Sequence, residues 1–486
     1  MAIAINILLT LLYTPWMVNK IGQADYGLYT LSISLIGILM LDFGLGSTIS
    51  RFASKYRAEG NQKAIDSLVG SLFKLYLAID IVILFVLTII FFFINNIYKS
   101  LNANEIEKFK ILYIMIASFN LVAFPFAPLS GILTVYEKFI QLKLCDLFNK
   151  IFSAALVILL LSSSANVYGV VGANIFSSLL TIIIKLVIIK KSTPIRVDLK
   201  SREKGIYTKI FTFTLWTTII SITHRLTHNI TPSVLGITCG SKEIALYSPS
   251  VSISTYFYTI ATAINGLFLP RISKFVSDKE ENKIDELLIK VGRYQVLVLG
   301  VLFIGFVCVG KEFMALWMGP QYIKSYYCTI LIMLPAVVDF SQQIANTTVV
   351  VKNKIRYQAI CTSCTSVIGL VLSYFLSGVY GAVGSCIAIC IATSLNVIYM
   401  NFVYYKKINM NIPEFFRKCY LPAIVPAALT ILISKLLLSF IPESGWGIFA
   451  LKVVMVAVLY FVLYFVFFVT VGEKKIIFRK IRRQDT

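Results

Sequence analysis

Charged side chains are scarce in this sequence, and acidic ones and histidines are scarcest. Asp, Glu, Lys and Arg make up 14% of the 486 residues, only 23 residues are acidic, and there are two histidines. Soluble domains carry about 25% charged and about 45–50% apolar residues, whereas apolar residues here reach 58%. This balance excludes a soluble enzyme and a disordered chain.

The nine cysteines do not form a disulfide or metal framework, because most lie inside apolar runs. Cys361-x-x-Cys364 resembles a redox or metal motif, but it has no second pair and no nearby histidine. Small buried thiols packed between helices explain it better. We therefore expect no metal site and no cofactor.

Long apolar runs dominate the chain, and most are close to the 20 or so residues that a helix needs to cross a bilayer. The runs are 2–18, 28–49, 68–97, 111–135, 147–164, 170–189, 210–237, 244–269, 294–309, 326–351, 357–377, 382–404, 421–440 and 448–471. They predict an all-α integral membrane protein with 14 transmembrane helices.

The net charge of +22 is explained by how the basic residues are distributed among the connections between the predicted helices. Most of the 45 lysines and arginines fall in every second connection and in the C-terminal tail. Because cytoplasmic loops carry an excess of Lys and Arg, this pattern predicts that both termini are cytoplasmic. No basic loop belongs to a folded domain large enough to read bases, so we expect no nucleic-acid partner.

Two sets of motifs recur along the chain at a nearly constant offset. They are Gly22-x-x-Asp25-x-x-x-Tyr29 with Gly240-x-x-Glu243-x-x-x-Tyr247, and Val167-Tyr168-Gly169 with Val379-Tyr380-Gly381. The alternative is that membrane loops share Gly and Tyr generically. A tandem repeat predicts two six-helix lobes, 1–205 and 206–407, followed by two extra helices and a basic tail in 408–486. Both repeats begin on the cytoplasmic side, so they are parallel, and such transporters bind substrate near the midplane between them.

Three segments resemble Wzx-type polysaccharide and O-antigen flippases, which belong to the multidrug/oligosaccharidyl-lipid/polysaccharide exporter superfamily. The segments are Pro15-x6-Gly22-x-x-Asp25-Tyr26-Gly27-x-Tyr29, Leu41-Asp42-x-Gly44-Leu45-Gly46-x4-Arg51-Phe52, and Gly310-x-x-Phe313-x-x-x-Trp317-x-Gly319-x-x-Tyr322. The resemblance covers the first twelve predicted helices. The chain departs from it at His224, where relatives often have an acidic or amide residue.

The resemblance implies a transporter that moves an oligosaccharide linked to undecaprenyl diphosphate. Transport would run by alternating access from the cytoplasmic to the outer leaflet of the bacterial cytoplasmic membrane. Membrane lipids, and polysaccharide polymerase or chain-length proteins, would be its partners.

A cationic cluster lies near the middle of the predicted seventh helix. It reads His224-Arg225-x-x-His228-Asn229-x-x-Pro232, with the two histidines and Arg225 on one helix face. A cation at the bilayer centre costs at least about 2.5–3.5 kcal/mol, so Arg225 should face a polar interior. We predict that Arg225, His224 and His228 bind substrate and that Asn229 lines the cavity; the alternative is a structural ion pair between Arg225 and an acid.

Intramembrane acids and amides supply the remaining candidates. Asp80 and Asp339 lie at comparable depth and predict cation coupling or a partner for Arg225. Asp42, closer to the cytoplasmic side, fits a structural role better than an ion-coupling one. Asp339, Gln342, Gln343 and Asn346 have the spacing of one helical stripe, and the amides would line a polar cavity. The coupling ion, H⁺ or Na⁺, and a drive by membrane potential stay open.

Two further features concern packing. Pro125, Pro128 and Gly131 break the fourth run, either as a hinge or to shape packing. Lys74, Lys150, Lys185, Lys435 and Lys452 lie near helix ends and are expected to extend their ammonium groups to the interface.

Two other functions remain as alternatives to the flippase. A drug or cation antiporter of the same superfamily would favour an acidic, aromatic cavity. A membrane glycan polymerase or glycosyltransferase would need a large outer loop with catalytic groups, and no such loop or nucleophile–base pair is present. The sequence therefore predicts a transporter and not an enzyme.

Overall fold

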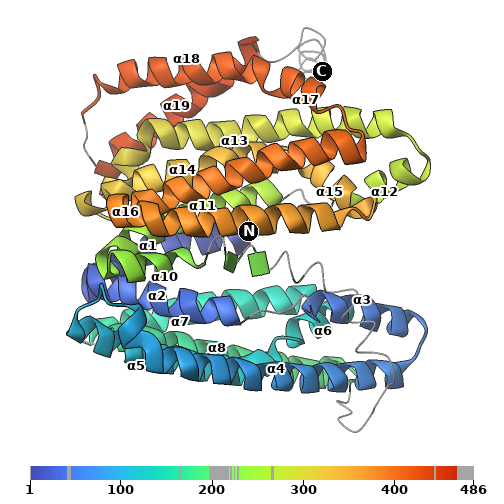
Figure 1. Cartoon of the computed structure of the whole chain (residues 1–486), viewed down its shortest axis with the longest axis vertical. Helices are drawn as coiled ribbons and strands as arrows, with labels where there is room; N and C mark the ends of the chain where they lie inside the picture. Colours follow the sequence, from blue (N-terminus) through green and yellow to red (C-terminus); the bar gives the residue numbers. More distant parts are fainter. Residues whose placement is uncertain are drawn as a thin grey trace, which may run out of the picture. The chain divides into compact units, whose positions relative to one another are not determined.

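The computed structural model describes residues 2–40, 45–163, 166–195, 218, 222–223, 225–226, 229–263, 267–442 and 445–467. These residues form helices and connections, with no strand among them (Figure 1). Apolar runs fold this way because a helix satisfies its backbone N–H and C=O groups within one segment, as the bilayer core requires. The predicted all-α membrane fold is confirmed.

Most of the helices follow the predicted apolar runs in order, and a few short ones lie largely in predicted connections. The helices are α1 (Ala2–Ile21), α2 (Gln23–Leu39), α3 (Leu45–Ala58), α4 (Gln62–Ile97), α5 (Ala103–Ala123), η1 (Phe124–Phe126), α6 (Leu129–Val135), α7 (Phe139–Ser162), α8 (Val167–Ser192), α10 (Thr231–Thr238), α11 (Ser241–Thr262), α12 (Leu269–Ser277), α13 (Glu281–Trp317), η2 (Pro320–Tyr322), α14 (Ile323–Ser341), α15 (Gln343–Val351), α16 (Ile355–Ile408), α17 (Ile412–Cys419), α18 (Leu421–Leu438) and α19 (Gly445–Phe467).

Nine segments in the described part of the chain are long and apolar enough to cross a membrane. One of them, α16, has 54 residues, which at 1.5 Å per residue is about 81 Å, far longer than a bilayer. Half of the predicted seventh run, 210–237, lies outside the described residues. The count of 14 helices therefore stays a prediction.

The length of α16 is explained by a reversal at Gly381, where the backbone is non-helical (φ 60°, ψ −138°). Ser373 Oγ donates to Ser385 Oγ at 2.9 Å, and Cys361 Sγ to Asn396 Oδ1 at 3.1 Å, so the two arms run antiparallel. A Cβ on Gly384 would lie 2.0 Å from the Leu376 carbonyl oxygen, which shows how closely the arms approach. The arms correspond to the predicted runs 357–377 and 382–404.

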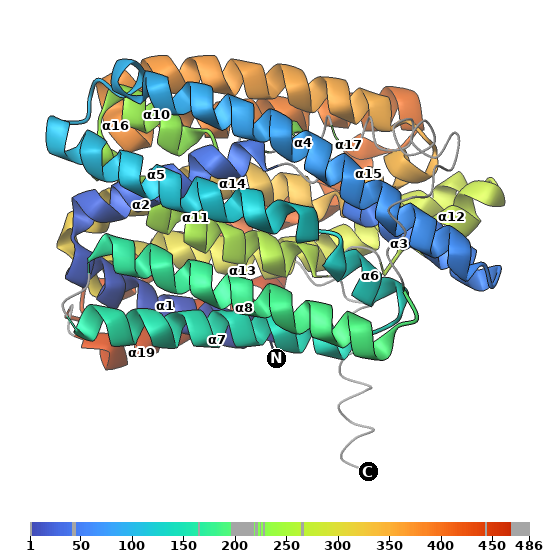
Figure 2. The same ribbon diagram turned by 90° about the horizontal axis from the view of Figure 1, so that it is seen from below.

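The chain divides into two compact units: Met1–Ser248 with Thr362–Ser385, and Pro249–Cys361 with Cys386–Thr486. The predicted lobes 1–205 and 206–407 are defined by repeats, whereas these units are defined by contacts, so the lobes stay a prediction. In the first unit α4, α5, α7 and α8 lie side by side (Figure 2). Fully buried Leu68 and Tyr76 of α4 and Phe109 and Leu112 of α5 contribute to its core.

In the second unit α13 is the central helix, with α14, α15, α17, α18 and α19 packed against it. Buried Leu288 of α13, Tyr404 of α16, Phe415 of α17 and Tyr460 of α19 belong to one apolar cluster. Gly300 allows α19 to pack closely against α13, since a Cβ there would lie 2.2 Å from the Tyr460 hydroxyl. The last two helices are thus fixed to this unit through α13.

Candidate functional site

Arg225, the centre of the predicted cationic cluster, is half-buried and lies in the first unit. Its Nη1 donates to the carbonyl of Gly37, in the last turn of α2. The last four carbonyls of a helix lack partners within the helix, and a cation there interacts favourably with the helix dipole. This bond uses one of the five N–H donors of the guanidinium.

The neighbours of Arg225 are only partly described. The backbone N–H of Asn229 donates to the Arg225 carbonyl at 2.8 Å, and Thr223 Oγ1 lies 3.1 Å from Ser363 Oγ. His224, His228 and Asp42 lie outside the described residues. The substrate-binding roles of Arg225 and the two histidines therefore stay predictions.

Asp80 lies on α4 and is half-buried. Its Oδ1 is shielded from solvent and has no hydrogen-bond partner among the described residues. Within that same part of the chain, the carboxylate forms no ion pair. A shielded carboxylate oxygen without a partner is costly unless it takes up a proton or a cation.

Asp339 lies on α14 in the second unit. Its carboxylate interacts electrostatically with the hydroxyls of Tyr258, Tyr404 and Tyr420. The described residues of this unit supply no basic partner within ion-pair distance of it.

The predicted polar stripe after Asp339 is interrupted. The helix ends at Ser341 and restarts at Gln343, so Gln342 lies at a break between α14 and α15. Its side chain is buried, and Nε2 donates to Asn401 Oδ1 at 2.5 Å. Gln342 therefore joins two helices, while Gln343 and Asn346 remain half-buried on α15.

The beginnings of the two predicted repeats contact each other inside the first unit. Tyr26 OH lies 2.8 Å from Ser248 Oγ, linking α2 to α11. The Ser241 hydroxyl donates to Glu105 Oε1. Glu105 also forms a capping box with Asn102 at the start of α5. A Cβ on Gly27 would lie 2.0 Å from the Ser241 carbonyl oxygen, so only glycine permits this approach.

The motif glycines have matching backbone geometry, with φ of 88° at Gly22 and 95° at Gly240. Both values lie in the region that favours glycine. The paired acids have different partners. Asp25 forms an ion pair with Lys108 at 2.8 Å, whereas Glu243 accepts the backbone N–H of Ala382 at 2.8 Å, beside Gly381.

Two of the lysines expected to reach the interface are paired instead. Lys452 of α19 is buried, with its Nζ 2.8 Å from Glu312 Oε2 on α13. Lys185 of α8 lies 3.2 Å from Asp146 Oδ1. The acids that pair with these two lysines lie on other helices, so the sequence alone could not identify the pairs.

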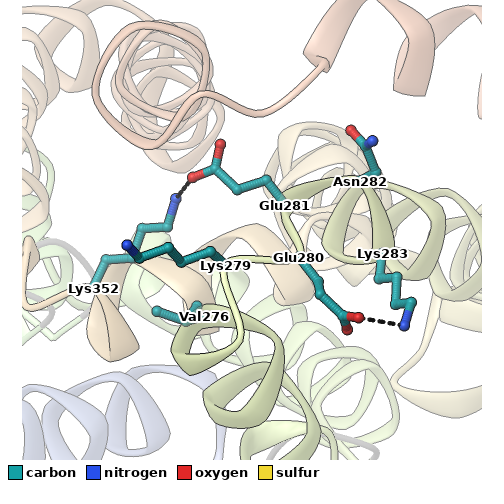
Figure 3. Close-up of a pocket in the computed structure, with 7 residues that line it drawn as sticks. All are labelled: Val276, Lys279, Glu280, Glu281, Asn282, Lys283 and Lys352. Carbon is teal, nitrogen blue, oxygen red and sulfur yellow. Dashed lines mark hydrogen bonds and ion pairs between the residues drawn. The ribbon is translucent and has the colours of Figure 1, made fainter.

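A pocket of about 560 Å³ lies where α12 meets α13, on the side predicted to be cytoplasmic. Figure 3 shows its charged lining paired in two places: Lys352 Nζ to Glu281 Oε1 and Lys283 Nζ to Glu280 Oε1, both at 2.6 Å. Lys352 also donates to the Ile408 carbonyl at 2.9 Å. The Lys352 contacts join the start of α13 to the ends of α15 and α16. The paired charges leave a nearly neutral lining, so the pocket does not suit a diphosphate.

Comparison with known proteins identifies a matching family model and solved structures with a similar fold. The family model described as "Polysaccharide biosynthesis protein" matches residues 1–276. A structure titled "Lipid II flippase MurJ, inward closed conformation" has a TM-score of 0.72 at 15% identity, covering 96% of this chain and 97% of that one.

An inward-facing multidrug resistance MATE family transporter of the MOP superfamily has a TM-score of 0.70 at 15% identity, covering 85% of this chain and 96% of its own. A MOP superfamily transporter from Pyrococcus furiosus has a TM-score of 0.57 at 15% identity, with coverage of 85% and 94%. Comparison with curated protein sequences finds no match.

Proposed function

The chain belongs to the polysaccharide biosynthesis protein family, and from this membership we propose that it is a flippase for a lipid-linked oligosaccharide. The cargo would be carried on undecaprenyl diphosphate and would move from the cytoplasmic to the outer leaflet of a bacterial cytoplasmic membrane. The chain would act as a transporter and would form no covalent intermediate with the cargo.

The observation that carries this proposal is the length of the match to a lipid flippase. That structure covers 96% of the chain, whereas the MATE transporter covers 85%. A protein that carries a lipid needs surfaces that a transporter of soluble drugs does not, and α18 and α19, packed on α13, are available for that role.

Arg225 is the residue proposed to hold the diphosphate. A guanidinium is a planar fork that can bind two phosphate oxygens at once. The Gly37 carbonyl orients it from one side. His224 and His228 would add positive charge when protonated, since histidine titrates near neutral pH.

Alternating access would require the contacts between the two repeat beginnings to separate. The Tyr26–Ser248 and Ser241–Glu105 hydrogen bonds are the contacts that would break. The bond between the two hydroxyls has a net contribution of about 0.5–1.5 kcal/mol and the bond to the Glu105 carboxylate one of about 1.5–3 kcal/mol, so their loss could be reversed during a transport cycle.

A second candidate, a drug or cation antiporter, is favoured by the environment of Asp339. Such a transporter would use an acidic, aromatic site, and the Asp339 carboxylate has electrostatic interactions with Tyr258, Tyr404 and Tyr420. In the flippase proposal the same group would instead couple transport to H⁺ or Na⁺.

A chromosomal deletion separates the two candidates. Analysis of lipid-linked glycans should reveal an undecaprenyl-linked repeat unit accumulating on the cytoplasmic face, and plasmid-borne protein should clear it. Unchanged lipid-linked glycans together with increased drug sensitivity would support the antiporter and overturn the flippase.

A further inference from the structure

The proline break in the fourth predicted helix opens a cavity that the proposed transport site does not use. After α5 ends at Ala123, η1 contains Pro125, and α6 starts behind Pro128. Proline removes a backbone donor and pushes the chain out of helical register. Figure 2 shows the displaced α6 close to the end of α8.

The cavity measures about 880 Å³ and lies between α4, this break and the end of α8. Its walls are almost entirely apolar: Val69, Phe73, Ile132, Leu186 and Ile189 are among them. Leu186 is 38% exposed, so the α8 wall of the cavity reaches the surface of the protein.

Cations flank the apolar walls. Lys190 lines the cavity near its end, is exposed, and makes no hydrogen bond or ion pair with any residue that the structure describes. A smaller, polar cavity of about 210 Å³ shares Phe126 and Leu129 with the first. Lys185 lines this second cavity, held by Asp146 at 3.2 Å and Ser130 Oγ at 3.3 Å.

We propose that the larger cavity binds an anionic glycerophospholipid, with an acyl chain between α4 and α8 and the phosphate at Lys190. Apolar walls together with a lysine that has no partner among the described residues match the two parts of such a lipid. A basic residue near the membrane surface attracts anionic lipid, and an acyl chain fills the gap left by the proline break, where empty apolar volume would be unfavourable. Arg225 does not line this cavity, so the bound lipid is separate from the transported cargo.

The test measures lipid binding to the purified full-length protein, with no transport assay. Native mass spectrometry would compare phosphatidylglycerol with phosphatidylcholine of the same acyl chains. We expect phosphatidylglycerol to bind more tightly. Lys190→Gln should weaken its binding about fivefold, as expected for one basic residue near a membrane surface. Lys191→Gln, which removes the adjacent lysine outside the cavity, should change it less than twofold.

A second pair of variants tests the acyl-chain half. Leu186→Trp should fill the cavity and reduce bound phosphatidylglycerol, whereas Val187→Trp, on the next and also exposed position, should not. Equal binding of the two phospholipids, or equal effects of the two lysine variants, would overturn the headgroup assignment. If undecaprenyl phosphate displaced phosphatidylglycerol at equal concentration, the occupant would be a carrier lipid and the proposal would be wrong.

Discussion

At the scale of single residues, the anion-binding role proposed for Arg225 can be tested separately from its contact with the end of α2. Its contact with Gly37 is of the kind that contributes about 0.3–1 kcal/mol, so Arg225→Ala should still reach the membrane. We expect that variant to lose glycan export and Arg225→Lys to retain part of it, because lysine keeps the charge without the planar fork. Export and protein level would be measured in the same membranes.

The competing structural explanation makes Arg225 a partner of Asp80 or Asp339. Recovery of export in Arg225→Gln combined with Asp80→Asn or Asp339→Asn would contradict the anion-binding role. Persistent loss in both double variants, at normal protein level, would support it.

Gly27 gives a residue-scale test of the contact between α2 and α11. In an exposed helix, Gly→Ala is stabilising by about 1 kcal/mol. At Gly27 the added Cβ would meet the Ser241 carbonyl at 2.0 Å, so we expect Gly27→Ala to cost about 1–3 kcal/mol, as overpacking does. Gly37→Ala, with nothing within 4 Å, is the matched control. Thermal unfolding in detergent should show a lower Tm only for the first, and equal Tm values would refute the contact.

The sequence predicted these residues unevenly. Gly22 and Gly240 could be recognised as equivalent because each begins a copy of the same recurring motif, and both have a positive φ. The partners of Asp25 and Glu243 could not, since equivalent motif positions meet a lysine in one case and a backbone N–H in the other. Partner choice depends on packing between helices far apart in sequence.

At the scale of helices, the Lys452–Glu312 pair attaches α19 to α13. Removing one member of a buried pair leaves the other charge uncompensated and costs about 3–5 kcal/mol. Lys452→Met should therefore lower the Tm strongly, and adding Glu312→Gln should restore most of the loss. Lys435→Met, at an exposed position on α18, should leave the Tm unchanged. An equal effect of the two lysine variants would disprove a stabilising role for the pair.

Helix existence was predictable, and a helix interruption was predictable only where proline or glycine marks it. Apolar runs determine where helices form, and the proline pair correctly marked the break at η1. The break at Gln342 has no proline or glycine, and follows from its buried bond to Asn401. The reversal at Gly381 lies between two predicted runs, and the sequence marks it with the Tyr380-Gly381 motif.

At the scale of the whole molecule, transport should require Tyr26 and Ser248 to separate. In a variant lacking the native cysteines, Tyr26→Cys and Ser248→Cys joined by a short bifunctional thiol reagent should stop export. A reducing agent that cleaves the linker should restore it. The single-cysteine variants treated with the same reagent are the controls. Continued export by the cross-linked protein would show that this contact persists through the cycle.

The most direct test of lipid-linked oligosaccharide transport uses purified protein in liposomes. An undecaprenyl diphosphate-linked trisaccharide with a fluorescent sugar would be placed in both leaflets, and a membrane-impermeant quencher would report the accessible fraction over time. The flippase account predicts that wild-type protein makes the protected fraction accessible and that Arg225→Ala protein does not. Equal rates in empty liposomes, wild-type liposomes and Arg225→Ala liposomes would contradict it.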